Sequence, residues 1–162
     1  MHEPVTLRRA TPDDWRAYRA LRLRSLELAP DAFGSTLDAE SPQPDEWWRG
    51  RLATSHTLLA EVDGVAVGIG TGIRDRHEIG SREIVGLWVE PEFRGRGIAR
   101  EMIETLAVWA RDAAAHAIAL WVSDGNPARR VYERAGFVAT GERDVVRGTL
   151  MEERMRRTLE RS

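Results

Sequence analysis

The sequence predicts an α/β domain built around a mixed β-sheet. Apolar strand patterns alternate with helical patterns along the chain, in the order β-α-α-β-β-β-α-β-α-β-β. The run 117–122 is almost purely apolar, which is typical of a central strand covered on both faces. A third observation is the strand 83–89, which passes through a glycine turn directly into a helical pattern. The length of 162 residues suits one domain with a buried core, spanning 1–162.

The N-terminal half supplies one strand, two helices and a hairpin. Thr11 and Pro12 predict a helix start, because a hydroxyl caps the first amides and proline suits the first helical position. Asp63-Gly64 is a favoured two-residue turn between two apolar strands. The predicted elements are a strand at 5–8, helices at 11–28 and 45–53 separated by a loop at 30–44, and strands at 57–62 and 65–70.

The C-terminal half begins with the strand 83–89 and continues through two helices. Apolar residues from Met102 to Ala113 recur at helical spacing, and Asn126-Pro127 resembles an N-cap followed by a first helical proline. Gly136 is placed to end that helix. The predicted elements are helices at 98–115 and 126–136, and strands at 117–122, 137–140 and 151–155.

Composition and charge exclude several classes of function. A net charge of −2 favours neither nucleic acid nor an anionic membrane as a partner. The absence of cysteine excludes a disulfide framework and a cysteine nucleophile, and the absence of lysine excludes Schiff-base chemistry. The four histidines lack metal-ligand spacing, so no metal site is expected. No signal peptide or membrane-spanning run is recognised, and we expect a cytoplasmic protein.

The glycine turn Arg94-Gly95-Arg96-Gly97-Ile98-Ala99 is the strongest candidate for a binding site. A glycine turn between a strand and a helix presents free backbone N–H groups to one point, which suits a phosphate. The alternative is a tight connection that needs glycine only for its backbone freedom. The turn matches neither the dinucleotide fingerprint nor a Walker loop. Gly68, Gly70 and Gly72 lie inside a strand pattern and are interpreted as structural.

The region around this turn resembles the GNAT superfamily of N-acetyltransferases. Arg94-x-x-Gly97-x-Ala99 matches the acetyl-CoA signature Gln/Arg-x-x-Gly-x-Gly/Ala of that family. Leu87-Trp88-Val89-x-Pro91 precedes it, and Asn126 followed by Tyr132-Glu133-x-x-Gly136-Phe137 comes after it. The resemblance implies a single GNAT-like domain with a mixed sheet of about seven strands and four helices, splayed between the fourth and fifth strands.

The resemblance also implies how acetyl-CoA binds. The pyrophosphate would lie on the amides of 96–100, with positive charge from Arg94 and Arg96, and the pantetheine arm would hydrogen-bond the strand at Leu87 and Val89. Asn126 is either a helix cap or a contact to the arm. The implied binding residues are Leu87, Trp88, Val89, Arg94, Gly95, Arg96, Gly97, Ile98, Ala99, Arg100, Asn126 and Arg129.

The implied reaction is attack of an amine on a thioester. Deprotonating an alkyl amine at pH 7 costs about 4.6 kcal/mol, which calls for a base. Glu83 is the candidate, because it lies eleven residues before Arg94, as in the histone-acetyltransferase branch. The alternative for Glu83 is an exposed ion pair with Arg82, and Glu40 and Glu90 are weaker candidate bases. Tyr132 occupies the family position of the general acid, and its alternative is a core packing role.

The acceptor is expected to be a primary amine, on a small molecule or a protein N-terminus. Phe33 and Glu40 are candidate substrate contacts, on the side formed with Leu37, Trp47 and the 75–78 loop. The acidic residues there favour a cationic amine. The rival hypothesis is a sensor module that binds acyl-CoA without catalysis. A homodimer is common in the family, and the sequence leaves the oligomeric state open.

Overall fold

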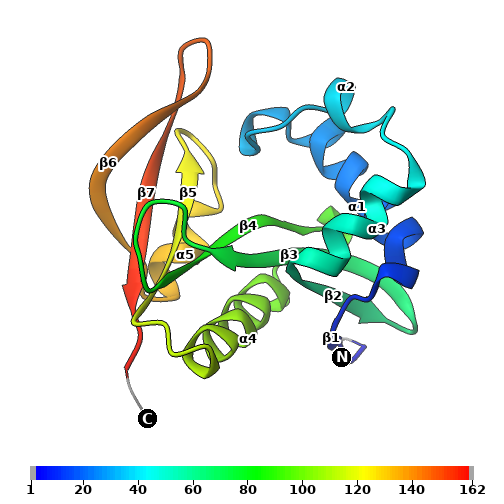
Figure 1. The fold of residues 1–162 in the computed structure, drawn as a ribbon, viewed down its shortest axis with the longest axis horizontal. Coiled ribbons are helices and arrows are strands. Elements are labelled where there is room, and N and C mark those ends of the chain that lie inside the picture. The colour runs from blue at the N-terminus through cyan, green and yellow to red at the C-terminus, as the bar shows by residue number, and fades with distance from the viewer. Residues whose placement is uncertain (1–2, 161–162) are drawn as a thin grey trace.

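The computed structural model describes residues 3–160, which form a seven-stranded sheet with helices on both faces (Figure 1). The strand order is β1-β2-β3-β4-β5-β7-β6, and every neighbouring pair is antiparallel except β4 and β5. The strands are β1 (Thr6–Arg9), β2 (His56–Val62), β3 (Val65–Arg74), β4 (Ser81–Val89), β5 (Ala117–Ser123), β6 (Val138–Arg147) and β7 (Leu150–Thr158).

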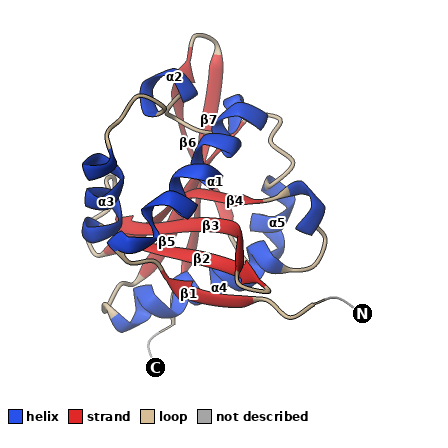
Figure 2. Ribbon diagram, turned by 90° about the vertical axis from the view of Figure 1, so that its right-hand side faces the viewer, coloured by secondary structure: helices blue, strands red, loops and turns tan. Residues whose placement is uncertain are grey.

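Two helical layers enclose the sheet. Helices α1 (Trp15–Leu28), α2 (Leu37–Glu40) and α3 (Asp45–Thr54) lie on one face, and α4 (Ile98–Asp112) lies on the other (Figures 1 and 2). The α4 layer buries Met102 and Leu106 against Ile118 of β5. The α1–α3 layer packs around Trp48, with Tyr18 edge-on to it at 5.9 Å between ring centroids. The short helix α5 (Arg129–Arg134) adds Tyr132 to the α4 side.

The splay expected between the fourth and fifth strands is present. Strands β4 and β5 pair only at Ser81–Ala117, Arg82–Ile118 and Glu83–Ala119, and no residue pair joins them beyond that point. The remaining halves, Ile84–Val89 and Leu120–Ser123, therefore carry main-chain groups that this ladder does not use. This is the structural basis for an added, strand-like ligand between them.

A bulge lies in β4 next to the splay. The register with β3 shifts between Ile69 and Thr71, so Gly86 and Leu87 both face Gly70. Gly86 has φ +62°, a left-handed conformation that glycine adopts without strain. The bulge turns Leu87 towards the α4 layer, where its Cδ1 would be 2.9 Å from a Cβ at Gly70. A Cβ at Gly72 would be 2.3 Å from the Trp109 ring, in agreement with a structural role for these strand glycines.

The fold class predicted from the sequence is confirmed, with differences in individual elements. Within residues 3–160 there are five α-helices rather than four, because the one-turn helix α2 forms inside the segment predicted as a loop. The first helix begins as a 3₁₀ turn, Pro12–Asp14, in which Asp14 accepts a 2.8 Å hydrogen bond from the Thr11 amide. The last two strands are much longer than predicted, since their polar residues are paired across the β6–β7 hairpin.

Candidate functional site

The glycine turn forms an uncapped helix N-terminus directly after the splayed part of β4. Gly97 is the N-cap of α4 with φ +79°, and no side chain caps the helix there. A Cβ at Gly95 or Gly97 would meet no atom within 4 Å, so the space in front of these residues is open. Ile98 is buried and anchors the first turn in the core, while Ala99 is half-buried and Arg100 is exposed. The first amides of α4 are thus free to bind an anion, as the sequence predicts.

The arginine side chains of the turn are engaged with the protein itself. Nε of Arg94 donates a 3.0 Å hydrogen bond to the Val89 carbonyl, and its guanidinium lies 4.5 Å from the Trp88 ring centroid. Arg96 lies over Phe93 at 4.9 Å. The contact of Arg94 fixes the turn to the end of β4 and occupies the Val89 carbonyl. The main-chain amides at the start of α4 remain open to a phosphate, and the Nη groups of exposed Arg94 form no hydrogen bond within residues 3–160.

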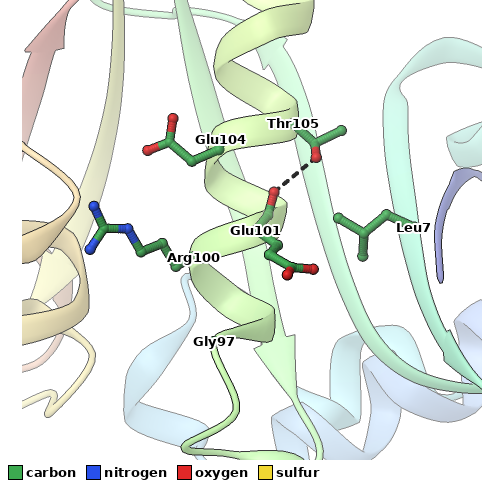
Figure 3. A pocket seen from close by; sticks show the side chains of 6 residues that line it. All are labelled: Leu7, Gly97, Arg100, Glu101, Glu104 and Thr105. Atoms are coloured by element: carbon green, nitrogen blue, oxygen red, sulfur yellow. Dashed lines mark hydrogen bonds between the residues drawn. The ribbon is translucent and has the colours of Figure 1, made fainter. Parts of the chain in front are cut away.

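A shallow depression of about 550 Å³ lies along the outer face of α4 (Figure 3). It is lined by Leu7, Gly97, Arg100, Glu101, Glu104 and Thr105. The hydroxyl of Thr105 donates a 2.8 Å hydrogen bond to the main-chain carbonyl of Glu101. The depression shares Gly97 with the open helix end, but its two glutamates disfavour an anionic ligand along its length. We do not place the phosphate site there.

The turn before α5 faces the splay from the β5 side. The helix begins at Arg129 with Ala128 as its N-cap, so Asn126 is not the helix cap that the sequence predicted. Instead Asn126 Oδ1 accepts a 2.9 Å hydrogen bond from the Ala128 amide, because Asn126-Pro127 forms a separate turn. Arg129 lies 3.5 Å from Glu153 and 4.0 Å from Glu133, so its charge is partly neutralised.

Tyr132 lies in the core beneath that turn, edge-on to Phe137 at 6.4 Å between ring centroids. The side chain is buried, and burial raises the pKa of Tyr132 to about 12. The hydroxyl makes no hydrogen bond to any group in residues 3–160. The phenol therefore stays protonated at neutral pH and is able to donate its proton.

Glu83 lies at the point where β4 and β5 separate. It is 1 % exposed, and its carboxylate binds the Arg76 guanidinium, with Oε2 at 2.6 Å from Nη2 and Oε1 at 3.2 Å from Nε. Glu83 does not form the exposed ion pair with Arg82 that was the alternative interpretation of this residue. The Arg82 guanidinium lies over the Trp109 ring instead. The main-chain amide of Arg76 also donates a 3.3 Å hydrogen bond to Oε1, so Arg76 engages both oxygens of Glu83.

Glu40 and Phe33 are both buried on the α1–α3 face. Glu40 forms a two-point ion pair with Arg22 at 2.9 and 3.0 Å, and Arg51 adds a third bond at 3.1 Å. Burial acts to raise the pKa of Glu40, but the hydrogen bond and charge of Arg22 outweigh it and hold that pKa below its ordinary value. Phe33 packs edge-on to Trp88 at 6.5 Å, and Arg22 lies over its ring.

Three of the acidic residues expected around the acceptor, Glu40, Asp75 and Glu78, are paired with arginine, whereas Asp38, Asp45 and Glu46 form no ion pair within residues 3–160. Asp75 binds Arg154 at 2.5 Å, and Glu78 binds Arg156 at 2.9 Å. Glu90, the other candidate base, binds Arg24 at 2.7 Å. These pairs weaken the inference of a cationic acceptor from the count of acids alone, because each paired carboxylate offers little net charge to a ligand.

Sequence reasoning missed four charged residues around the splay: Arg22, Arg76, Arg147 and Glu152. Arg22 had a local signal, since it falls four residues from both Tyr18 and Leu26 on the buried face of α1. Arg147 and Glu152 had none, because their importance depends on the β6–β7 hairpin meeting other elements. Within residues 3–160 no helix is long and apolar enough to cross a membrane, and no group of three metal-ligating side chains is present.

The profile of the acetyltransferase (GNAT) family matches residues 19–137 of this chain, a span that contains both sides of the splay, the glycine turn and Tyr132. An uncharacterised N-acetyltransferase of Archaeoglobus fulgidus is 31% identical over 135 residues, which are 79% of this chain and 89% of that protein. An aminoglycoside N(6')-acetyltransferase type 1 of Stenotrophomonas maltophilia is 30% identical over 122 residues, 70% of this chain and 72% of that protein.

The fold is shared with solved structures at low sequence identity. The N-acetyltransferase paia of Thermoplasma acidophilum, solved in complex with coenzyme A, superposes with a TM-score of 0.76 at 14% identity. The match covers 96% of this chain and 99% of that one.

Proposed function

The chain belongs to the acetyltransferase (GNAT) family, and from that premise we propose that it transfers the acetyl group of acetyl-CoA to a primary amine. The observation that carries the proposal is the open N-terminus of α4, placed directly after a strand whose end leaves its parallel neighbour. A phosphate binds the first feature through main-chain amides, and an extended arm fits the second as an added strand.

The residues present fit acetyl-CoA. The amides of Gly97, Ile98 and Ala99 would hold the pyrophosphate, since nothing within residues 3–160 caps them with a side chain. The free edge of β4 around Leu87 would hold the arm, and a β4 amide would polarise the thioester carbonyl. When bound, acetyl-CoA supplies an activated acyl carbon, and the chain supplies position and proton transfer.

Tyr132 is the proposed general acid for the departing sulfur. A phenol of pKa about 12 gives its proton to a thiolate of ordinary pKa with an uphill step of about 5 kcal/mol. The same buried site also raises the pKa of a thiolate, which makes the step easier. Glu83 is the candidate base that the sequence names, and in this structure Arg76 binds its carboxylate.

The proposed acceptor is a primary amine on a small molecule. The relative from Stenotrophomonas maltophilia is named for an aminoglycoside acetyltransferase, which supports a small amine as the acceptor. A protein N-terminus is the alternative that an amine panel must include.

The chain contains no cysteine, which makes the test direct. A thiol reagent reports only the coenzyme A released, so a panel of amines, aminoglycosides and peptide N-termini can be screened without background from the protein. Thiol release that depends on both acetyl-CoA and an amine supports the proposal. Calorimetric binding of acetyl-CoA without turnover on any amine would instead identify the acyl-CoA sensor.

A further inference from the structure

Glu152 lies on the face of the sheet opposite α4, next to the open end of the splay. Register partners share a face, and β7 places Glu152 beside Ser123 of β5 and Asp144 of β6. On β5, Leu120 and Val122 point into the core beneath α4. Side chains alternate along a strand, so Ser123 points to the opposite face, and its register partner Glu152 points there as well. This is the face on which α1 and Phe33 lie, where an acceptor would approach.

Glu152 differs from the other carboxylates on this face because it has no partner. Glu40, Asp75, Glu78 and Glu83 each bind at least one arginine. Within residues 3–160 no group forms a hydrogen bond or ion pair with the carboxylate of Glu152, although the side chain is half-buried. Its carboxylate is therefore held by no protein group among the described residues and is available to an incoming cation.

The groups around Glu152 tune its affinity for protons. Burial raises its pKa, the negative charges of Asp144 and Glu83 add to the rise, and Arg76 and His77 oppose it. The His77 ring packs at a tilt against Trp121, with 5.0 Å between ring centroids. The indole Nε1 of Trp121 is itself buried without a partner among the described residues. On this face the carboxylate of Glu152 is thus the group that remains available to a ligand.

Resting on the proposed acetyl transfer, we propose that Glu152 receives the ammonium group of the acceptor and takes its proton. Glu83 then keeps its ion pair with Arg76 throughout, and it acts as a positioning residue at the root of the splay. The carboxylate of Glu152 can receive an ammonium group without breaking an ion pair, whereas Glu83 is held by three hydrogen bonds from Arg76.

The protons and bonds balance in this scheme. The ammonium gives one proton to the Glu152 carboxylate, and the neutral nitrogen forms a C–N bond to the thioester carbonyl carbon. The C–S bond then breaks with its electron pair on sulfur. Tyr132 protonates the sulfur and recovers a proton from the nitrogen. Glu152 finally returns its proton to solvent, so ammonium and thioester give amide, thiol and one free proton.

The test compares Glu152→Gln with Glu83→Gln and with a control, Glu142→Gln, whose side chain lies on the same hairpin at 52 % exposure. We expect Glu152→Gln to lower kcat/KM by about 100-fold. The substitution should also remove the acidic limb of the pH profile of kcat/KM. Acetyl-CoA affinity, measured by calorimetry, should not change. Glu83→Gln and Glu142→Gln should keep the acidic limb.

Two further measurements distinguish a proton-accepting role of Glu152 from a general loss of folding or activity in the variant. In carboxyl NMR, one glutamate that titrates above the ordinary range should disappear in Glu152→Gln. Glu152→Asp, which keeps a carboxylate, should recover the acidic limb. Suppose the wild type is active. If the acidic limb survives in Glu152→Gln, or if it vanishes in Glu83→Gln instead, the role of Glu152 is overturned and the proposed acetyl transfer still stands. A wild type that releases no thiol with any amine overturns the proposed function.

Discussion

The guanidinium of Arg147 donates a 2.8 Å hydrogen bond to the main-chain carbonyl of Phe33, 114 positions away in the chain. The same group also binds the carbonyls of Pro30 and Gly34. Arg147 ends β6, beyond the splay, whereas Phe33 follows α1, which packs on β3 and β4 before the splay. One side chain therefore joins the two halves of the molecule on the acceptor side.

Replacing Arg147 by alanine should loosen the acceptor side without affecting the coenzyme A side. We expect the free energy of unfolding to fall by about 2 kcal/mol, because hydrogen bonds to a charged group are lost. The KM for the amine should rise several-fold while acetyl-CoA affinity is unchanged. Urea unfolding, steady-state kinetics and calorimetry measure these effects. Arg143→Ala is the control, since within residues 3–160 Arg143 on the same strand pairs only with exposed Asp124 and with Glu153. Equal effects on KM in both variants would refute a bridging role for Arg147.

Gly97→Ala should weaken acetyl-CoA binding, and the loss of folding stability caused by the substitution should not account for the weaker binding. An alanine at φ +79° is strained by about 1–2 kcal/mol, and its methyl group would stand in front of the α4 amides. Gly64→Ala is the matched control, because Gly64 has φ +77° and equally open space but lies in the β2–β3 turn. Both variants should lose similar stability in thermal melts. Only Gly97→Ala should lose acetyl-CoA affinity, by about tenfold, and equal affinity in the two variants would argue against the site.

Tyr132→Phe should lower kcat by about 100-fold with little change in acetyl-CoA affinity, since the buried ring is retained. The variant should also change stability at high pH. Burial raises the pKa of Tyr132 from 10.0 to about 12. The contribution of the protonated phenol to the free energy of unfolding is therefore complete below pH 10 and is lost as the pH rises to 12. The wild type should therefore lose about 3 kcal/mol more than Tyr132→Phe over that range. Parallel stability curves for the two proteins would contradict the burial of the phenol.

Glu40→Gln should destabilise the protein by about 3–5 kcal/mol, because it leaves the buried Arg22 without its counter-charge. Asp38→Asn is the control, from the exposed side of the same helix. The pKa of Glu40 is lowered, so its contribution is present above the ordinary glutamate pKa and is lost as the pH falls below it. A denaturation series from pH 7 to pH 3 measures this loss. A fall in activity with unchanged stability would instead indicate that Glu40 contacts the substrate.

The elements that depend on local pattern were predictable from the sequence. The Asp63-Gly64 hairpin, the β4–glycine–α4 junction and the apolar strand β5 follow from turn chemistry and periodicity, which act over a few residues. The uncapped N-terminus of α4 at the glycine turn was also predictable, because main-chain amides at a helix end need no distant partner. The length of the β6–β7 hairpin did not, because its polar residues carry no apolar alternation.

The sequence by itself determined the fold class and the open N-terminus of the helix after the glycine turn, and it singled out Tyr132 as the candidate general acid. Only the tertiary structure decided which charges are free. Glu83 is held by Arg76 and Glu40 by Arg22, whereas Glu152 has no partner among the described residues. A carboxylate's partner comes from a segment that local sequence does not specify, and its burial is set by every element packed around it. Chemistry that rests on backbone amides is therefore visible in the sequence, and chemistry that rests on an unpaired charge is decided by the fold.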